Sequence, residues 1–139
     1  MERILAIDYG QKRTGIAVTD PLQMIASALE TVPTAQLMDW LRQYMSREPV
    51  ERIIVGEPVH LNGNVSDTMT QFVTPFVNRL RKSFPDKEVI LVDERFTSKL
   101  AAMAMLEGGM KKKERQEKAN LDKLSATILL QGYLETLKR

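Results

Sequence analysis

Residues 4–20 read ILAIDYGQKRTGIAVTD, and this stretch decides how the chain begins to fold. Two apolar runs flank a short polar turn that contains Gly10, a pattern typical of two antiparallel strands. The first run is apolar at four consecutive positions, as in a strand that is buried on both faces. It ends at Asp8. The stretch therefore predicts a buried hairpin with one acid at the end of its first strand.

Asp8 is the first candidate for a functional residue. A carboxylate beside a dry core is unfavourable by several kcal/mol unless a cation, a metal ion or hydrogen bonds compensate its charge. Lys12 and Arg13 lie at the tip of the predicted turn, close to this acid. The combination indicates a site for a metal ion, a phosphate or both. Lys12 and Arg13 either contact a substrate or only occupy a turn, and the pattern leaves both interpretations open.

The composition is that of an ordinary globular protein, with 43% hydrophobic and 27% charged residues among 139, and it predicts one domain over residues 1–139. No apolar run approaches the roughly 20 residues that a membrane span requires. The chain has no cysteine and one histidine, His60, which excludes thiolate metal sites and a histidine-rich zinc site. A metal would have to be held by carboxylates, which favours Mg²⁺ or Mn²⁺. The lack of cysteine suits a reducing, cytoplasmic location.

The positive charge is concentrated in one segment. The net charge is +2, but residues 1–110 contain twelve Lys/Arg against fourteen Asp/Glu, whereas residues 111–118 (KKKERQEK) contain five against two. Such a segment suits a loop that contacts phosphates. A solvated linker or a frayed helix end explains it equally well. The predicted contacts in this segment are Lys111, Lys112, Lys113 and Arg115.

Apolar periodicity predicts the remaining elements. Strands are expected over residues 25–32, 52–55 and 89–92, and helices from residue 33, over 66–83, over 97–109 and from residue 120. Pro75 falls inside the second helix and predicts an interruption there. Three strands followed by alternating helices and strands predict an α/β fold. We expect a five-stranded mixed sheet, with an antiparallel meander of three strands and then two parallel strands, flanked by helices.

Three of the predicted strands end in acidic residues, namely Asp8, Glu57 and the pair Asp93-Glu94. Ligands of open α/β sheets bind outside the carboxyl ends of the strands. Asp122 is a further candidate, because it heads an apolar stripe on the last predicted helix. Singly, each acid has a plain alternative as a turn cap, an ion-pair partner or a first-turn acid favoured by the helix dipole.

Together, Asp8, Glu94 and Asp122 could hold two divalent ions about 4 Å apart, an arrangement that hydrolyses phosphodiesters. Basic side chains would then contact the phosphate backbone of a nucleic acid. Besides the 111–118 segment, these are Lys12, Arg13, Arg95 and Lys99.

Four segments, AIDYGQKRTGIAVTD, IIVGEPVHLNG, VDERFTS and KANLDKLSATILLQGYLE, match the motifs of the YqgF/RuvX family in order and spacing. On these motifs the chain resembles that family over nearly its whole length. The resemblance implies a ribonuclease H-like fold akin to RuvC resolvases. It also implies a nuclease that matures the 5′ end of pre-16S rRNA, with resolvase-like relatives. The acidic positions of the family fall on Asp8, Glu94 and Asp122, as catalytic metal ligands.

Glu57 departs from the family pattern, in which an apolar residue usually precedes the following proline. It is either an extra acid of the metal site, as on the equivalent strand of related resolvases, or a substitution in a loop. We favour the second interpretation.

Three functions remain open on the sequence. The first is a metal-dependent endonuclease acting on pre-rRNA, alone or on ribosomal precursor particles, as a monomer or homodimer. The second is a resolvase of branched DNA, which would act as a dimer. The third is a nucleic-acid or ribosome-assembly binding protein without turnover. The three acids argue against the third, because carboxylates repel phosphate unless a cation intervenes. A two-lobed ATP-binding fold shares the Asp-x-Gly hairpin but needs a longer chain.

Overall fold

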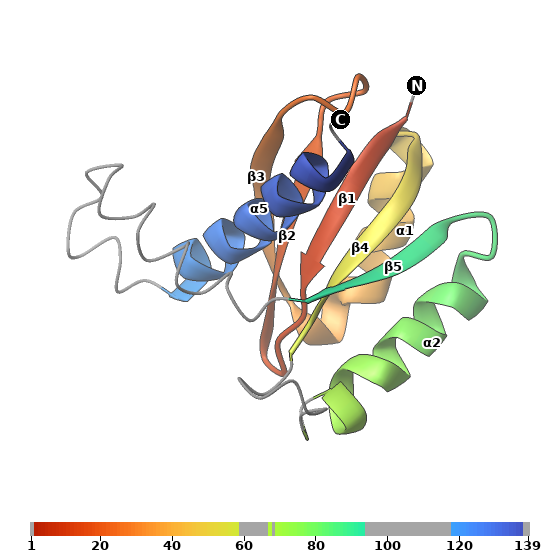
Figure 1. Ribbon diagram of the computed structural model, residues 1–139. Helices are drawn as coiled ribbons and strands as arrows, with labels where there is room; N and C mark the ends of the chain where they lie inside the picture. Colours follow the sequence, from red (N-terminus) through yellow and green to blue (C-terminus); the bar gives the residue numbers. More distant parts are fainter. Residues whose placement is uncertain (1, 59–66, 68, 94–117, 138–139) are drawn as a thin grey trace.

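A computed structural model describes residues 2–58, 67, 69–93 and 118–137, with the side chains of 118–122 outside that description. The chain folds as strands and helices that alternate after an initial run of three strands (Figure 1). The elements are β1 (Arg3–Asp8), β2 (Arg13–Thr19), β3 (Ala26–Pro33), the 3-10 turn η1 (Thr34–Gln36), α1 (Leu37–Arg47), β4 (Val50–Glu57), the π-helical turn η2 (Met69–Val73), α2 (Thr74–Ser83), β5 (Glu88–Asp93) and α5 (Lys118–Leu137).

The five strands form one mixed sheet in the order β3-β2-β1-β4-β5. β1 and β2 pair antiparallel, as do β2 and β3, whereas β4 pairs parallel with both β1 and β5. The predicted sheet, a three-stranded meander followed by two parallel strands, is therefore confirmed. β1 lies at its centre, which explains why four consecutive residues of this strand are apolar.

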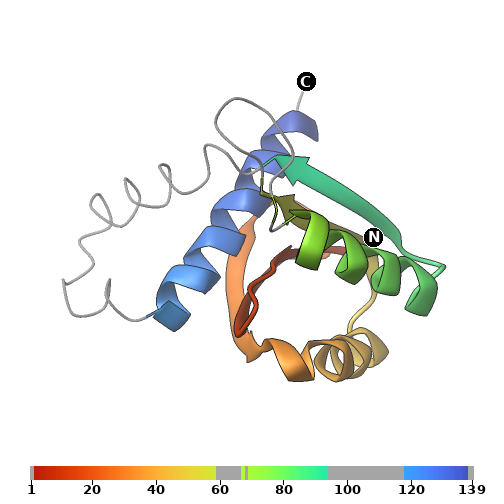
Figure 2. The ribbon, with the colours of Figure 1, turned by 90° about the horizontal axis from the view of Figure 1, so that it is seen from below.

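Alternate residues of β1 pack into two different cores. Leu5 and Ile7 face a core that is completed by apolar residues of α1 and α2. Ile4 and Ala6 face a second core that is completed by α5. Figures 1 and 2 show the same arrangement, with α5 on one side of the sheet and α1 on the other. Leu37, Leu41 and Tyr44 of α1 are buried in the first core, and Trp40 packs against it.

Several element boundaries differ from those predicted. β4 is eight residues long instead of four, and the helix expected from residue 33 begins with a 3-10 turn before α1 starts at Leu37. The interruption expected at Pro75 is present as the π-helical turn η2, which gives way to α2 at Thr74. Proline has no N–H, so it fits the first turn of α2 but not the interior of a longer helix. The predicted helix over 97–109 lies outside the described residues.

α5 is fixed to the sheet by packing and by one polar contact. Ala126, Leu129 and Leu130 are buried against the sheet. Near the end of the helix, the Tyr133 hydroxyl accepts a hydrogen bond of 2.9 Å from Nη1 of Arg52 on β4. In the part of the chain that the structure describes, no helix has the length and apolar character needed to cross a membrane.

Candidate active site

The carboxyl ends of three neighbouring strands bring acidic residues to one edge of the sheet. Ile7 of β1 lies opposite Val55 of β4. Asp8 is the next residue after Ile7, and Glu57 is the second residue after Val55. Glu57 in turn lies opposite Asp93 of β5. Asp8, Glu57 and Asp93 therefore share the edge at which ligands bind in open α/β sheets.

The three acids do not lie on the same face of the sheet. Side chains alternate along a strand, so Asp8 shares the face of Ile4 and Ala6, which α5 covers. Glu57 follows Val55 by two residues and thus alternates onto the opposite face, whose core contains α1 and α2. Asp93 alternates onto that face as well, two residues after Leu91. The geometry separates Glu57 and Asp93 from the face on which Asp8 is half-buried.

α5 carries the second predicted acid, Asp122, to the same face as Asp8. Asp122 lies in the second turn of α5, four residues before Ala126 and seven before Leu129, both of which are buried against the sheet. Residues at this spacing share one side of a helix. This spacing predicts Asp122 on the stripe of α5 that faces the sheet; its side chain lies outside the description.

The turn after Asp8 is held by a relay of two threonine hydroxyls. The Gly10 N–H donates to Thr14 Oγ1 at 3.4 Å, and the Thr34 hydroxyl donates to the Gly10 carbonyl at 2.6 Å. Thr14 Oγ1 and Thr34 Oγ1 lie 2.9 Å apart. Because the Thr34 proton is used at Gly10, the Thr14 hydroxyl donates to Thr34. Both backbone polar groups of Gly10 are thereby joined to one closed chain of hydrogen bonds.

Further contacts fix the same turn from both sides. The backbone N–H of Thr34 donates to the Lys12 carbonyl at 3.0 Å. The ring of Tyr9 stacks on that of Phe76 in α2, with centroids 4.4 Å apart. Lys12 is exposed on this rigid turn, and Arg13 is half-buried. Lys12 thus has a fixed backbone and a side chain accessible to a ligand.

The sequence did not single out Thr14 or Thr34. Thr14 is fully buried, and a β-branched residue within an apolar strand is an ordinary strand residue. Its partner is 20 residues away, so no local spacing connects the two hydroxyls.

Replacing Thr34 with valine is expected to loosen the turn without opening the core. The Gly10 carbonyl and the Thr14 hydroxyl would lose their partner, at a cost of about 1–3 kcal/mol in the free energy of unfolding. Faster amide hydrogen exchange at Gly10 and a lower melting temperature should report this. Thr34→Ser keeps the hydroxyl and serves as the control. Equal exchange rates in Thr34→Val and the wild type would show that the relay does not hold the turn.

Most of the predicted basic contacts, and one of the three acids, lie outside the described residues. They are Glu94, Arg95, Lys99, Lys111, Lys112, Lys113 and Arg115. Among residues 2–58, 67, 69–93 and 118–137, no three His, Asp or Glu side chains gather as metal ligands. The three-acid site thus stays a prediction, since it requires Glu94 and the side chain of Asp122.

The sheet order, the helix on each face and the acid at the end of the central strand define a ribonuclease H-like fold. The chain belongs to the RuvX family, because the family model, described as "Holliday junction resolvase", matches residues 2–136. The resemblance to the YqgF/RuvX family on sequence motifs is thereby confirmed.

Relatives and solved structures agree with this assignment. A protein of Phocaeicola vulgatus named "Putative pre-16S rRNA nuclease" is 62% identical over 138 residues, which cover 99% of each chain. A protein of Bacteroides fragilis with the same name is 57% identical over 136 residues, covering 98% of each. RuvC of T. thermophilus in complex with a Holliday junction substrate superposes with a TM-score of 0.60 at 16% identity, covering 98% of this chain and 96% of RuvC. The RuvC match shows a shared fold.

Proposed function

We propose that this protein is a metal-dependent endonuclease that processes the 5′ end of pre-16S rRNA by phosphodiester hydrolysis. One observation carries the proposal: half-buried Asp8 lies at the carboxyl end of the central strand, on the face to which α5 brings Asp122. This is the edge at which ligands bind in open α/β sheets, and carboxylates placed there suit a divalent cation. The names of the relatives support a pre-16S rRNA substrate. Such a substrate would place the protein in the cytoplasm.

Asp8, Glu94 and Asp122 would hold Mg²⁺ or Mn²⁺. The donor set fits these ions, because carboxylate oxygens are the ligands they prefer and the chain has no cysteine to select a softer metal. When bound, a divalent cation supplies Lewis acidity to a phosphodiester and its leaving oxygen.

The residues of this chain would perform the other tasks. The turn of residues 9–12 holds Lys12 beside Asp8, where its ammonium group can pair with a phosphate oxygen of the substrate. Arg13 would contribute from the first position of β2. Arg95, Lys99, Lys111, Lys112, Lys113 and Arg115 would extend these backbone contacts. Because they bind phosphates rather than bases, such contacts position a substrate without reading its sequence.

A second candidate function is resolution of branched DNA. The description of the family and the fold shared with RuvC support it. Two-fold symmetric junctions require two active sites, so a resolvase would act as a homodimer. The solution mass, measured with and without a four-way junction, tests this requirement.

The deciding experiment compares cleavage of a 5′-extended 16S rRNA fragment with cleavage of a four-way DNA junction, in Mg²⁺, Mn²⁺ and a chelator. We expect metal-dependent cleavage of the RNA that leaves a 5′-phosphate. Cleavage of the junction alone would favour the resolvase. Tight RNA binding that is unaffected by the chelator, without cleavage of either substrate, would support a non-catalytic binding protein.

The pair Glu57→Gln and Glu94→Gln tests which strand-end acids act. Glu57 alternates onto the face away from Asp8, so Glu57→Gln is expected to keep cleavage within about threefold of the wild type. Glu94→Gln is expected to lose cleavage, since an amide is a weak ligand for a hard cation. The rate of RNA cleavage at saturating Mg²⁺ measures both effects. A large loss in Glu57→Gln would instead include this acid in the metal site.

A further inference from the structure

The loop between β2 and β3 displays three large apolar side chains to solvent. Leu22, Met24 and Ile25 are 61%, 67% and 66% exposed. They fall within four consecutive residues, whereas large exposed apolar residues on a folded surface are normally scattered. We call Leu22, Met24 and Ile25 the loop patch. The sequence had placed Ile25 in a strand, but β3 begins at Ala26 and leaves it exposed.

The loop patch is held by a dense set of hydrogen bonds. The Asp20 carboxylate accepts from the backbone N–H groups of Leu22, Met24 and Ile25 at 3.2, 2.9 and 2.8 Å. The Asp20 carbonyl also accepts from the N–H of Gln23 at 2.9 Å. These hydrogen bonds fix the loop backbone in a conformation that leaves the three apolar side chains exposed to solvent.

Gln23 anchors the loop to the body of the protein. Its backbone has a φ of 58°, in the left-handed region that few residues other than glycine adopt. Its side-chain amide donates to the carbonyl of Glu2 at 2.8 Å and to the carboxylate of Glu51. A surface that is already ordered loses little conformational entropy when it binds a partner. The hydrogen bonds of the loop therefore hold the loop patch in its exposed position.

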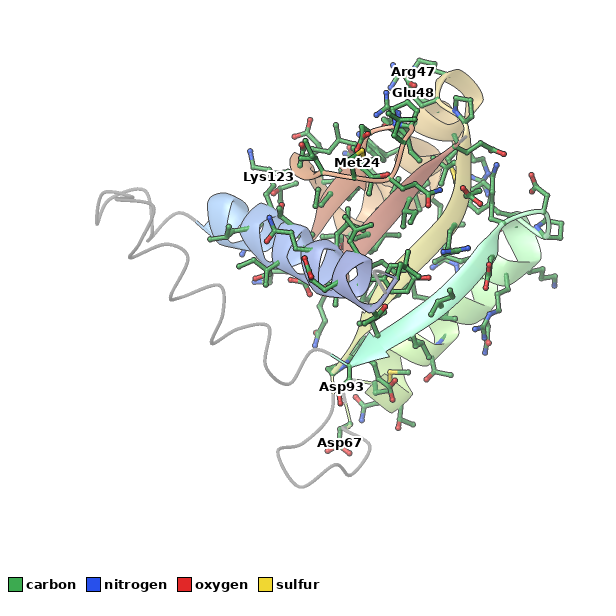
Figure 3. All side chains as sticks on the ribbon, turned by 45° about the horizontal axis from the view of Figure 1, so that its top comes forward. Met24, Arg47, Glu48, Asp67, Asp93 and Lys123 are labelled. Atoms are coloured by element: carbon green, nitrogen blue, oxygen red, sulfur yellow. The ribbon has the colours of Figure 1, made fainter. Side chains whose placement is uncertain are left out.

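The loop patch lies at the opposite end of the sheet from the candidate active site. Thr19, the last residue of β2, accepts hydrogen bonds from Arg3 and Ile4 at the beginning of β1. Asp8 lies at the other end of β1. Figure 3 shows the same separation, with Met24 and Asp93 at opposite ends of the molecule. A ligand on the loop patch would leave the strand-end acids open.

Two carboxylates border the loop patch: that of Asp20, which accepts from the backbone of the loop, and that of Glu51, which accepts from the Gln23 side chain. Hydrogen bonds from the backbone, that of Ile25 foremost, lower the pKa of Asp20, so this group is charged at neutral pH. The nearby guanidinium of Arg3 is engaged by the Thr19 carbonyl and by Glu48, at 2.9 and 3.3 Å. An apolar centre with an acidic border favours a partner that combines apolar side chains with positive charge.

The same charges disfavour the other occupants. RNA and anionic lipid surfaces would be repelled by the carboxylates. A second copy bound through the same surface would bring two acidic borders together. The neighbouring edge strand β3 also carries a register irregularity opposite Ile16 and Ala17, which hinders extension of the sheet by another copy.

We propose that the loop patch is a docking site for a basic, apolar-faced protein segment, separate from the catalytic surface. This proposal goes beyond the proposed nuclease function and does not depend on it. Bound at the far end of the sheet, such a segment would tether the protein to a partner while the strand-end acids remain accessible to a substrate.

The test uses the full chain and a synthetic helical peptide with leucines on one face and lysines beside them. Methyl NMR should show saturable shifts at Leu22, Met24 and Ile25. Leu22→Ser/Met24→Ser/Ile25→Ser is expected to weaken binding at least about tenfold, and Glu51→Gln a few-fold. Because the three side chains are exposed, the melting temperature should not change. Met24→Ser alone should weaken peptide binding in the same direction but by a smaller factor.

Two controls make the result specific. Leu137→Ser removes an apolar side chain that is 45% exposed but belongs to α5 and not to the loop, and this variant should bind the peptide like the wild type. A peptide with glutamates in place of the lysines should bind much more weakly. Equal binding by the triple-serine variant, or equal binding of both peptides, would overturn the proposal. So would RNA binding, vesicle binding or self-association that the triple-serine variant loses.

Discussion

Asp8→Asn is expected to reduce Mg²⁺-dependent RNA cleavage by at least about a hundredfold. Replacing even the outer partners of metal ligands costs 10–100-fold in affinity or activity, and Asp8 is proposed to be a direct ligand. The amide of asparagine keeps the size of the side chain but has no charge to bind a hard cation. The measurement is the single-turnover rate on the 5′-extended 16S rRNA fragment.

The same variant should keep its fold and lose its metal. Asp8 is half-buried beside the core, and asparagine keeps both the size of this side chain and an oxygen that accepts hydrogen bonds. We therefore expect Asp8→Asn to fold and to melt close to the wild type without metal. Added Mn²⁺ should raise the melting temperature of the wild type but not of the variant. Loss of cleavage together with unchanged Mn²⁺ stabilisation would mean that Asp8 acts in some way other than metal binding.

The sheet could be predicted because its signals are local. The hairpin of residues 4–20 consists of two apolar runs around a glycine turn, and the apolar residues of α1 recur at a helical spacing, so neighbouring residues alone specify these elements. Asp8 emerged as a candidate for the same reason, since a single acid after four apolar residues is visible without tertiary structure. Its position at the centre of the sheet follows from strand order, which the structure supplied.

The features that the sequence did not predict depend on residues far apart in the chain, or on which face of a strand a residue occupies. The Thr14–Thr34 relay joins positions 20 residues apart, and neither hydroxyl differs in sequence from an ordinary strand or turn residue. Glu57 required the register of β4, because a shift of one residue exchanges the two faces of a strand. Ile25 was assigned to the strand over residues 25–32, but its backbone N–H donates to the Asp20 carboxylate, which holds it in the loop before β3.

Gly10→Ala is expected to have the second large effect, because the turn beside Asp8 has no room for a side chain. A Cβ built on Gly10 would lie 2.2 Å from the carbonyl oxygen of Arg13, a backbone atom that cannot rotate away. The turn must therefore change shape, which would break the relay to Thr14 and displace Lys12. Overpacking of this kind costs about 1–3 kcal/mol in the free energy of unfolding. We expect kcat/KM for the RNA fragment to fall at least about tenfold.

Gly132→Ala is the matched control. Gly132 lies in α5, where an added Cβ meets no atom within 4 Å, so the same substitution introduces no clash. Alanine favours the helix by roughly 0.5–1 kcal/mol, and this variant should therefore melt slightly higher than the wild type with unchanged cleavage. Thermal denaturation and kcat/KM, measured on both variants, separate the effect on the turn from a general effect of glycine replacement. If Gly10→Ala matched Gly132→Ala in stability and cleavage, neither the fixed turn nor the position of Lys12 would contribute to activity.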